Sequence, residues 1–227
     1  HPEELIDYEL GWKYNSEKFF FNSNLYYMGY KNQLVLTGAL DDVGSPLREN
    51  SGKSYRTGIE LESVYKATNK LNISANISFS ENKNVDYKTN YNGVITNWGD
   101  TDISFSPNVI SSAGIQFNAS QDLTFALLNK FVGNQYMSNT ESNISKLSSY
   151  STTDLNILYM IKNSAYFSEI IFTAMINNIF NKEYVSNGYY YTYDDTWSDP
   201  NLITTIEGTG YYPQAKRNFL LGLTFKL

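Results

Sequence analysis

The chain has 227 residues, a formal net charge of −6, one histidine and no cysteine. The acidic balance disfavours nucleic-acid binding, which depends on basic side chains that contact phosphates. The lack of cysteine and of further histidines leaves no basis for a disulfide framework, a zinc site or a histidine-dependent catalytic triad. We therefore expect a protein that is not an enzyme and that holds no cofactor.

Alternation of apolar and polar residues is the main signal along the chain, and it predicts β-strands. It is clearest from Leu71 to Ser80 and again from Asn218 to Leu227. No segment shows a convincing helical period, and no apolar run approaches the roughly 18 residues of a membrane-spanning helix. In chain order, the nine predicted strands cover residues 4–14, 18–30, 53–67, 70–82, 102–118, 122–135, 149–162, 167–179 and 214–227.

Short turns and long polar loops alternate between these strands. The short turns lie at Asn15-Ser16-Glu17, Thr68-Asn69-Lys70, Ser120-Gln121-Asp122 and around Lys162-Asn163-Ser164. The long loops lie at about 31–52, 83–101, 136–148 and 180–213. This pattern is typical of an up-and-down barrel in the bacterial outer membrane, with short periplasmic turns and long external loops. It predicts an all-β fold, a transmembrane antiparallel β-barrel whose C-terminus lies in the periplasm.

The composition agrees with a wall that has one face in lipid and the other in water. Aromatic residues make up 16% of the chain, yet the mean hydropathy is only −0.40. Aromatic side chains near strand ends, such as Trp12, Tyr14 and Tyr65, suit the girdles at the two membrane surfaces. Glu60 and Glu62 share the opposite, inward face of the third predicted strand.

The odd strand count predicts that the barrel is incomplete. Bacterial barrels of this type have an even number of strands, and an unpaired strand edge in lipid leaves backbone groups unsatisfied. The first and ninth strands are therefore expected to pair with strands outside residues 1–227. The start, His1-Pro2-Glu3-Glu4, leads almost directly into a strand and resembles a cut through a longer chain, whereas the last strand reads as the true C-terminus.

Several short motifs follow one another in a fixed order. They are Pro2-Glu3 with Tyr8-Glu9-Leu10-Gly11-Trp12-Lys13, Tyr27-Met28-Gly29-Tyr30-Lys31-Asn32-Gln33-Leu34-Val35, Ser54-Tyr55-Arg56-Thr57-Gly58-Ile59-Glu60-Leu61-Glu62, Phe105-Ser106-Pro107, Asn177-Asn178-Ile179-Phe180-Asn181-Lys182-Glu183-Tyr184, and Tyr212-Pro213-Gln214-Ala215-Lys216-Arg217-Asn218-Phe219. As an ordered set, they resemble the C-terminal half of the barrel of TonB-dependent outer-membrane receptors. The sequences of these motifs are most similar to those of receptors from Bacteroidota-type bacteria.

The resemblance implies a barrel of about 22 strands that is filled by an N-terminal plug domain. Residues 1–227 would be its C-terminal part, without the plug and the N-terminal strands. It implies active import of a scarce nutrient, driven by the TonB complex through an N-terminal box that this chain lacks. The cargo would be an iron–siderophore complex, with haem, cobalamin and glycan as further choices.

The resemblance also implies the remaining partners. These are the outer-membrane lipid, the remaining barrel strands, the plug domain, and the barrel-assembly machinery, which reads the last strand. Phe219, Phe225 and Leu227 are expected to form that assembly signal. The family usually ends on an aromatic residue, whereas this chain ends on Leu227. Charges of the plug could pair with Arg56, Glu60 and Glu62, or these side chains could simply form a solvated wall.

The last long loop is the strongest candidate for contact with the imported ligand, because aromatic side chains on an outer loop can stack on a ligand. The candidate residues are Tyr189, Tyr190, Tyr191, Tyr193 and Trp197, with Trp98 on the 83–101 loop. Asp194, Asp195 and Asp199 are weaker candidates for a hard cation such as calcium. The simpler alternative is a packing cluster of loops. The carboxylate pairs Asp41-Asp42 and Asp194-Asp195 are not expected to perform acid–base chemistry.

Two other functions remain open from the sequence. One is a non-transport or passive outer-membrane barrel, such as a porin or adhesin. A TonB box and plug sequence upstream of His1 would argue against it. The other is a secreted β-sandwich that binds carbohydrate through its aromatic residues, and it would be soluble without detergent.

Overall fold

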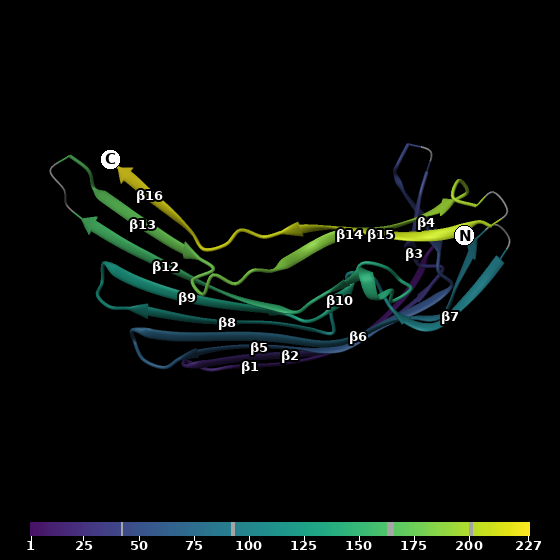
Figure 1. Ribbon diagram of the computed structural model, residues 1–227. Helices are drawn as coiled ribbons and strands as arrows, with labels where there is room; N and C mark the ends of the chain where they lie inside the picture. Colours follow the sequence, from purple (N-terminus) through teal and green to yellow (C-terminus); the bar gives the residue numbers. More distant parts are fainter. Residues whose placement is uncertain (42, 92–93, 163–165, 200–201) are drawn as a thin grey trace.

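The computed structural model describes residues 1–41, 43–91, 94–162, 166–199 and 202–227. Its dominant feature is one curved antiparallel sheet in which the main strands follow the order β1-β2-β5-β6-β8-β9-β12-β13-β16 (Figure 1). We call these nine strands the wall. Their bounds are β1 Glu4–Asn15, β2 Phe19–Lys31, β5 Lys53–Lys66, β6 Leu71–Tyr91, β8 Val109–Asn118, β9 Leu123–Val132, β12 Tyr150–Lys162, β13 Glu169–Asn177 and β16 Asn218–Lys226.

The all-β class and the nine predicted strands are confirmed, but several boundaries are wrong. The fourth strand was expected to end at residue 82 but continues to Tyr91, inside the predicted 83–101 loop, and the last strand was expected from residue 214 but begins at Asn218. The fifth strand was expected from residue 102 but begins at Val109. Residues 103–108 instead leave the sheet, with Phe105 at a φ of +54° and its N–H donated to the Tyr136 carbonyl at 2.8 Å. Pro107, which has no N–H to donate to a strand ladder, lies in the same stretch. The predicted turn residues Asn163 and Ser164, and Asp42, lie outside the described residues.

The long loops contain strands of their own, which the sequence did not indicate. β3 (Leu34–Leu40) pairs with β4 (Pro46–Asn50), and β14 (Val185–Asp195) pairs with β15 (Thr204–Pro213). β7 (Val94–Asp102) pairs with the outer part of β6. The third long loop holds the short bridge between β10 (Gln135–Tyr136) and β11 (Lys146–Leu147), with a 3₁₀ turn, η1, at Asn143–Ser145.

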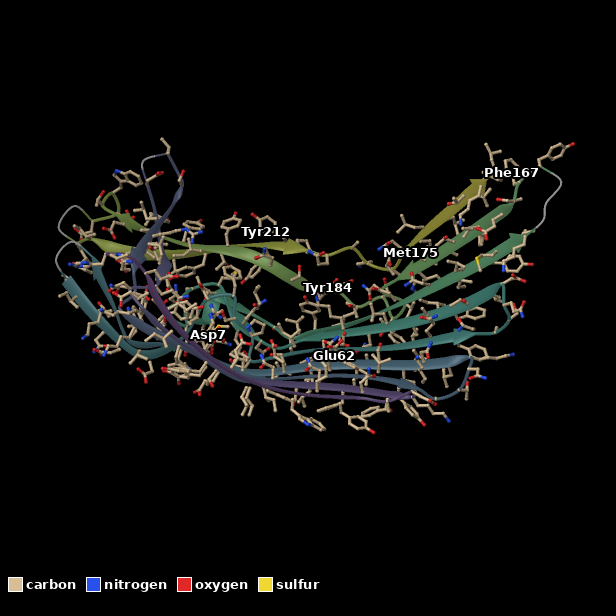
Figure 2. All side chains as sticks on the ribbon, turned by 180° about the vertical axis from the view of Figure 1, so that it is seen from behind. Asp7, Glu62, Phe167, Met175, Tyr184 and Tyr212 are labelled. Atoms are coloured by element: carbon tan, nitrogen blue, oxygen red, sulfur yellow. The ribbon has the colours of Figure 1, made fainter. Side chains whose placement is uncertain are left out.

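The register of the wall sorts its side chains onto two chemically different faces. Leu10, Leu25, Ile59 and Phe79 lie side by side on β1, β2, β5 and β6, and form one apolar row. The residues next to these on each strand point to the other face, where they form a polar row made of Gly11, Asn24, Glu60 and Ser78. The polar face is the concave one, as Glu62 and Met175 show in Figure 2.

The apolar, convex face is exposed. Leu10 and Leu221, on the two outermost strands, are 70% and 75% exposed. Toward the short turns, the rings of Trp12, Tyr14, Phe19 and Phe21 form a continuous chain of contacts, with centroids 5.6–6.3 Å apart. Such a surface matches a lipid solvent with an aromatic girdle. Among the described residues, no helix is long and apolar enough to cross a membrane.

The wall is open within the described chain, because β1 and β16 stand at the two ends of the strand order. It is also a single sheet, so the alternative of a β-sandwich, which needs two packed sheets, is wrong.

The buried side chains gather at the end of the wall opposite the short turns. There β3, the outer part of β6, residues 103–108, residues 133–149 and the β14–β15 hairpin pack together, and we call this region the loop cluster (Figure 1). The buried apolar residues are Val35, Tyr87, Ile103, Val132, Met137 and Leu147.

Candidate functional site

Asn139 connects three separate segments of the loop cluster. Its side chain is only 2% exposed. The Asn139 Nδ2 donates to the Leu36 carbonyl of β3 at 2.9 Å. The Asn139 Oδ1 accepts from the Ser104 N–H at 2.9 Å and from the Asn84 Nδ2 of β6 at 3.2 Å. Because an amide both donates and accepts, one side chain can hold β3, β6 and residues 103–108 against the 133–149 loop.

The cluster face of the β14–β15 hairpin is tied to the same loop. Tyr190 donates its hydroxyl to Glu207 Oε1 at 2.6 Å, and Ser142 donates to Glu207 Oε2 at 2.9 Å. Burial raises the pKa of Tyr190, and the hydrogen bond and charge of Glu207 raise it further. The Tyr190 ring lies over Gly38 of β3, where φ is +87° and an added Cβ would come within 2.9 Å of the ring. Tyr190 therefore serves the packing of the loops.

The opposite face of the hairpin carries a ladder of aromatic rings. Tyr189, Tyr191 and Tyr193 alternate along β14, with ring centroids 6.2 and 6.4 Å apart. Tyr212 of β15 joins them at 5.9 Å from Tyr189 and projects away from the loop cluster in Figure 2. The Tyr189 and Tyr191 rings cover Gly210 and Gly208, their cross-strand partners. We call these four residues the tyrosine ladder.

The other predicted ligand residues do not join the ladder. Trp197 lies beyond the end of β14 and is 84% exposed. Trp98 lies on β7, where its Nε1 donates to Thr89 Oγ1 at 3.0 Å. The six predicted aromatic residues thus divide between two faces of one hairpin, its tip region and a separate hairpin. Whether any of them contacts a ligand stays a prediction.

The predicted cation ligands have local structural roles in this arrangement. Asp195 Oδ1 accepts the N–H groups of Trp197 and Ser198 at 2.9 and 3.0 Å. Hydrogen bonds from Ser198 and Trp197 hold the pKa of Asp195 below its ordinary value. Asp194, which neighbours it on the other face, accepts from Thr205 Oγ1 at 3.1 Å. In the part of the chain that the structure describes, no three acidic, histidine or cysteine side chains are grouped to hold a metal ion. Asp199 lies beside this turn, and its backbone carbonyl accepts the Leu202 N–H at 3.1 Å.

The charged residues of the third predicted strand lie on the concave face but act differently. Arg56 Nη1 donates to Ser106 Oγ at 2.9 Å and to Asn82 Oδ1 at 3.3 Å, so it anchors residues 103–108 to the wall. Glu60 and Glu62 are exposed lower on the same strand. The predicted assembly residues Phe219, Phe225 and Leu227 lie along and just after β16, and Phe225 packs on Phe167 at 4.8 Å.

Several residues that shape the site have no distinctive signal in the sequence. Asn139 and Glu207 sit in polar loops among many similar residues, and nothing local marks the buried amide of Asn84, which is 0% exposed. Their roles arise from contacts between segments 17 to 103 positions apart in the chain. Only the strand alternation at Tyr189–Tyr193 could have separated the ladder from Tyr190 in advance.

A family comparison covers most of the chain. The family model described as TonB dependent receptor-like, beta-barrel matches residues 1–179. No protein with curated annotation matches the chain by sequence. The family and the structural neighbours are transport receptors rather than enzymes.

Solved structures share the fold at low sequence identity. The siderophore receptor PiuA from Acinetobacter baumannii is 17% identical, with a TM-score of 0.68 over 98% of this chain and 28% of that chain. The ferric yersiniabactin uptake receptor FyuA from Yersinia pestis is 17% identical, with a TM-score of 0.68 over 97% and 29%. The copper transporter OprC is 17% identical, with a TM-score of 0.70 over 99% and 32%. The chain thus spans about a third or less of these proteins.

Proposed function

Because the chain belongs to the TonB-dependent receptor-like β-barrel family, we propose that it forms part of an outer-membrane receptor for TonB-dependent import of a scarce nutrient, with an iron–siderophore complex as the cargo. The observation that carries this proposal is the two-faced wall. Its convex face is apolar and exposed, and its concave face is polar. A wall of this kind separates lipid from a water-filled or plugged interior.

In this proposal, the wall is completed by strands that pair with β1 and β16, to a barrel of about 22 strands around a plug domain. The plug faces the concave side, where Glu60 and Glu62 are free to pair with its cationic groups. The loop cluster lies outside the cell and the short turns lie in the periplasm. The barrel-assembly machinery reads β16 through Phe219, Phe225 and Leu227, and the TonB complex acts on an N-terminal box of the receptor.

The choice of cargo rests on the printed names of the structural neighbours. PiuA is described as a siderophore receptor and FyuA as a ferric yersiniabactin uptake receptor, whereas OprC is described as a copper transporter. The aromatic residues proposed to contact the cargo are Tyr189, Tyr191, Tyr193, Trp197 and Trp98. Tyr190 is a support for them, because its hydroxyl is engaged by Glu207.

An uptake experiment tests the proposal. A strain that lacks the complete receptor gene should accumulate less radioactive iron from a panel of ferric siderophores, and the intact gene should restore uptake. Uptake should also cease when the TonB motor is deleted. Uptake of small solutes that persists without the motor would instead identify the alternative, a passive barrel.

A second experiment tests the aromatic contacts. Tyr191→Ala with Trp197→Ala should weaken cargo binding about tenfold or more, as expected when stacking contacts worth about 1.4 kcal/mol are lost. Tyr166→Ala is the control, because Tyr166 is about as exposed as Trp197 but lies near the short turns. Unchanged binding by a correctly folded double variant would reject the ligand role of the hairpin.

A further inference from the structure

A pocket lies at the base of the loop cluster, on the cluster side of the β14–β15 hairpin. Its volume is about 320 Å³. The lining residues come from β11 with the stretch after it and from the connection between β13 and β14. They are Lys146, Leu147, Ser148, Ser149, Lys182, Glu183, Tyr184 and Val185, with Tyr211 of β15.

This pocket adjoins the concave face of the wall. Glu60, Ser78, Ile110, Val132 and Tyr150 form one continuous cross-strand row on that face. The Tyr184 ring, which lines the pocket, stacks on the Tyr150 ring with centroids 4.4 Å apart. Figure 2 shows Tyr184 on the same side of the sheet as Glu62 and Met175. A molecule that enters along the concave face therefore passes the pocket.

The backbone around the pocket is held in place. Asn178, which is 4% exposed, clamps Lys182 by donating to its carbonyl at 2.8 Å and accepting its N–H at 2.9 Å. On the opposite side, Asn134 Oδ1 accepts the Ser149 N–H at 2.7 Å. Tyr211 donates its hydroxyl to the Ile144 carbonyl at 2.9 Å. The pocket is therefore preformed, and a ligand need not order these segments on binding.

The pocket is positively charged within an acidic chain. Glu183, its only acidic residue, is ion-paired with Lys216, which holds the pKa of Glu183 below its ordinary value. Lys146 and Lys182 form no ion pair with any residue that the structure describes, and Lys146 Nζ instead lies 5.7 Å from the Tyr136 ring centre. Ser148 and Ser149, which line the same pocket, are exposed residues. A lining that includes two lysines and two serines suits a group with several anionic oxygens.

We propose that the pocket around Lys146 and Lys182 binds an oxyanion group, a carboxylate or a phosphate, carried by a soluble molecule at the mouth of the barrel. The soluble source follows from the position on the concave face, away from the apolar convex surface. The site itself stands on the pocket and its charges; only the identification of the molecule as cargo rests on the proposed import function.

Binding of defined anions to the full-length protein in detergent tests this site. Citrate and pyrophosphate should bind the unaltered protein, and Lys146→Met with Lys182→Met should weaken binding about tenfold, the loss expected from one or two charge-assisted hydrogen bonds. Lys53→Met with Lys130→Met removes the same charge from outside the pocket and should leave binding unchanged. Lys146→Arg with Lys182→Arg should retain binding, which separates loss of the site from loss of folding.

The source of the oxyanion is tested by competition in uncharged detergent, where no charged bilayer surface repels citrate. Citrate should bind equally with and without a few molar equivalents of phosphatidylglycerol. Bound citrate that a few molar equivalents of phosphatidylglycerol displace from the protein in uncharged detergent would mean that lipid phosphate occupies the pocket, and it would overturn the soluble source. Equal anion binding by the pocket variant and the control variant would overturn the site. No outcome depends on uptake, so failure of the import function would be seen separately.

Discussion

The side chain of Asn139 joins the segments of the loop cluster, so we expect its loss to destabilise them together. We expect Asn139→Ala to destabilise the cluster by about 3 kcal/mol, because the Leu36 carbonyl, the Ser104 N–H and the Asn84 amide lose a buried partner together. Hydrogen exchange should accelerate in residues 83–91 and 137–147 and stay unchanged in the wall.

Asn143→Ala is the matched control for this prediction. Asn143 lies four residues away in the same loop and is exposed. The Asn143→Ala variant should leave the hydrogen-exchange rates of the loop cluster unchanged. Equal protection in the two variants would contradict the role of Asn139.

Tyr87 should make the cluster sensitive to alkali. Burial raises its pKa from 10.0 to about 12, and the nearby charge of Glu49 adds to the shift. Because the folded pKa is raised, the stabilising contribution is complete below pH 10 and is lost as the pH rises through about 12. Tyr87→Phe should therefore shift alkaline unfolding of the cluster to higher pH, as measured by tyrosinate absorbance and circular dichroism.

The control for the alkaline transition is Tyr166→Phe, since Tyr166 is 86% exposed. It should leave the transition in place. An identical transition in Tyr87→Phe would show that another group causes the unfolding.

At the scale of the element, the β14–β15 hairpin shows what strand geometry adds to a sequence motif. The run Tyr189-Tyr190-Tyr191 suggested one aromatic surface, but successive side chains on a strand point to opposite faces. Tyr190 therefore packs inward on Gly38, while its neighbours form the ladder.

The face of this hairpin toward the loop cluster is held to η1 by the hydrogen bonds of Glu207. We expect Glu207→Gln to loosen the contact between the hairpin and η1, because a neutral amide accepts weaker hydrogen bonds from Tyr190 and Ser142 than a carboxylate does. The measurement is hydrogen exchange of β14 amides, which should become about tenfold faster for a loss near 1.4 kcal/mol. Glu49→Gln, on β4, is the control. Unchanged β14 exchange in Glu207→Gln would mean that packing on Gly38 holds the hairpin alone.

The elements that sequence reasoning found and missed differ in their surroundings. Wall strands such as Leu71–Ser80 alternate strictly, because one face meets an apolar solvent and the other a polar one. The hairpin strands β3, β4 and β7 have no apolar solvent on either face, so their alternation is weak. Residues 103–108 contain alternating polar and apolar side chains but leave the sheet, because Phe105 adopts a positive φ. Contacts of Asn139 between distant segments leave no local signal at all.

At the scale of the whole molecule, we expect a charged substitution to destabilise the protein in a bilayer far more on the convex face of the wall than on the concave face. Ile77→Lys, on the convex face, should cost about 2–4 kcal/mol on insertion into a bilayer if it lies near the midplane. Ser78→Lys, its neighbour on the concave face, should cost far less. Folding of the full-length protein into lipid vesicles, followed by denaturant titration, measures both. Equal costs would mean that the convex face does not contact lipid.

Strand β6 runs for 21 residues, but it pairs with β8 only as far as Phe79. Its pairing with the wall strand β5 continues to Val85, so residues 86–91 extend, at about 3.3 Å per residue, on the order of 20 Å beyond the wall. In the proposed orientation, the hairpin tips therefore project outward from the strand ladder, away from the lipid. A substitution at such a tip alters neither the lipid-facing surface nor the ladder, so the tips can change in sequence while the strands that hold the protein in the bilayer stay as they are.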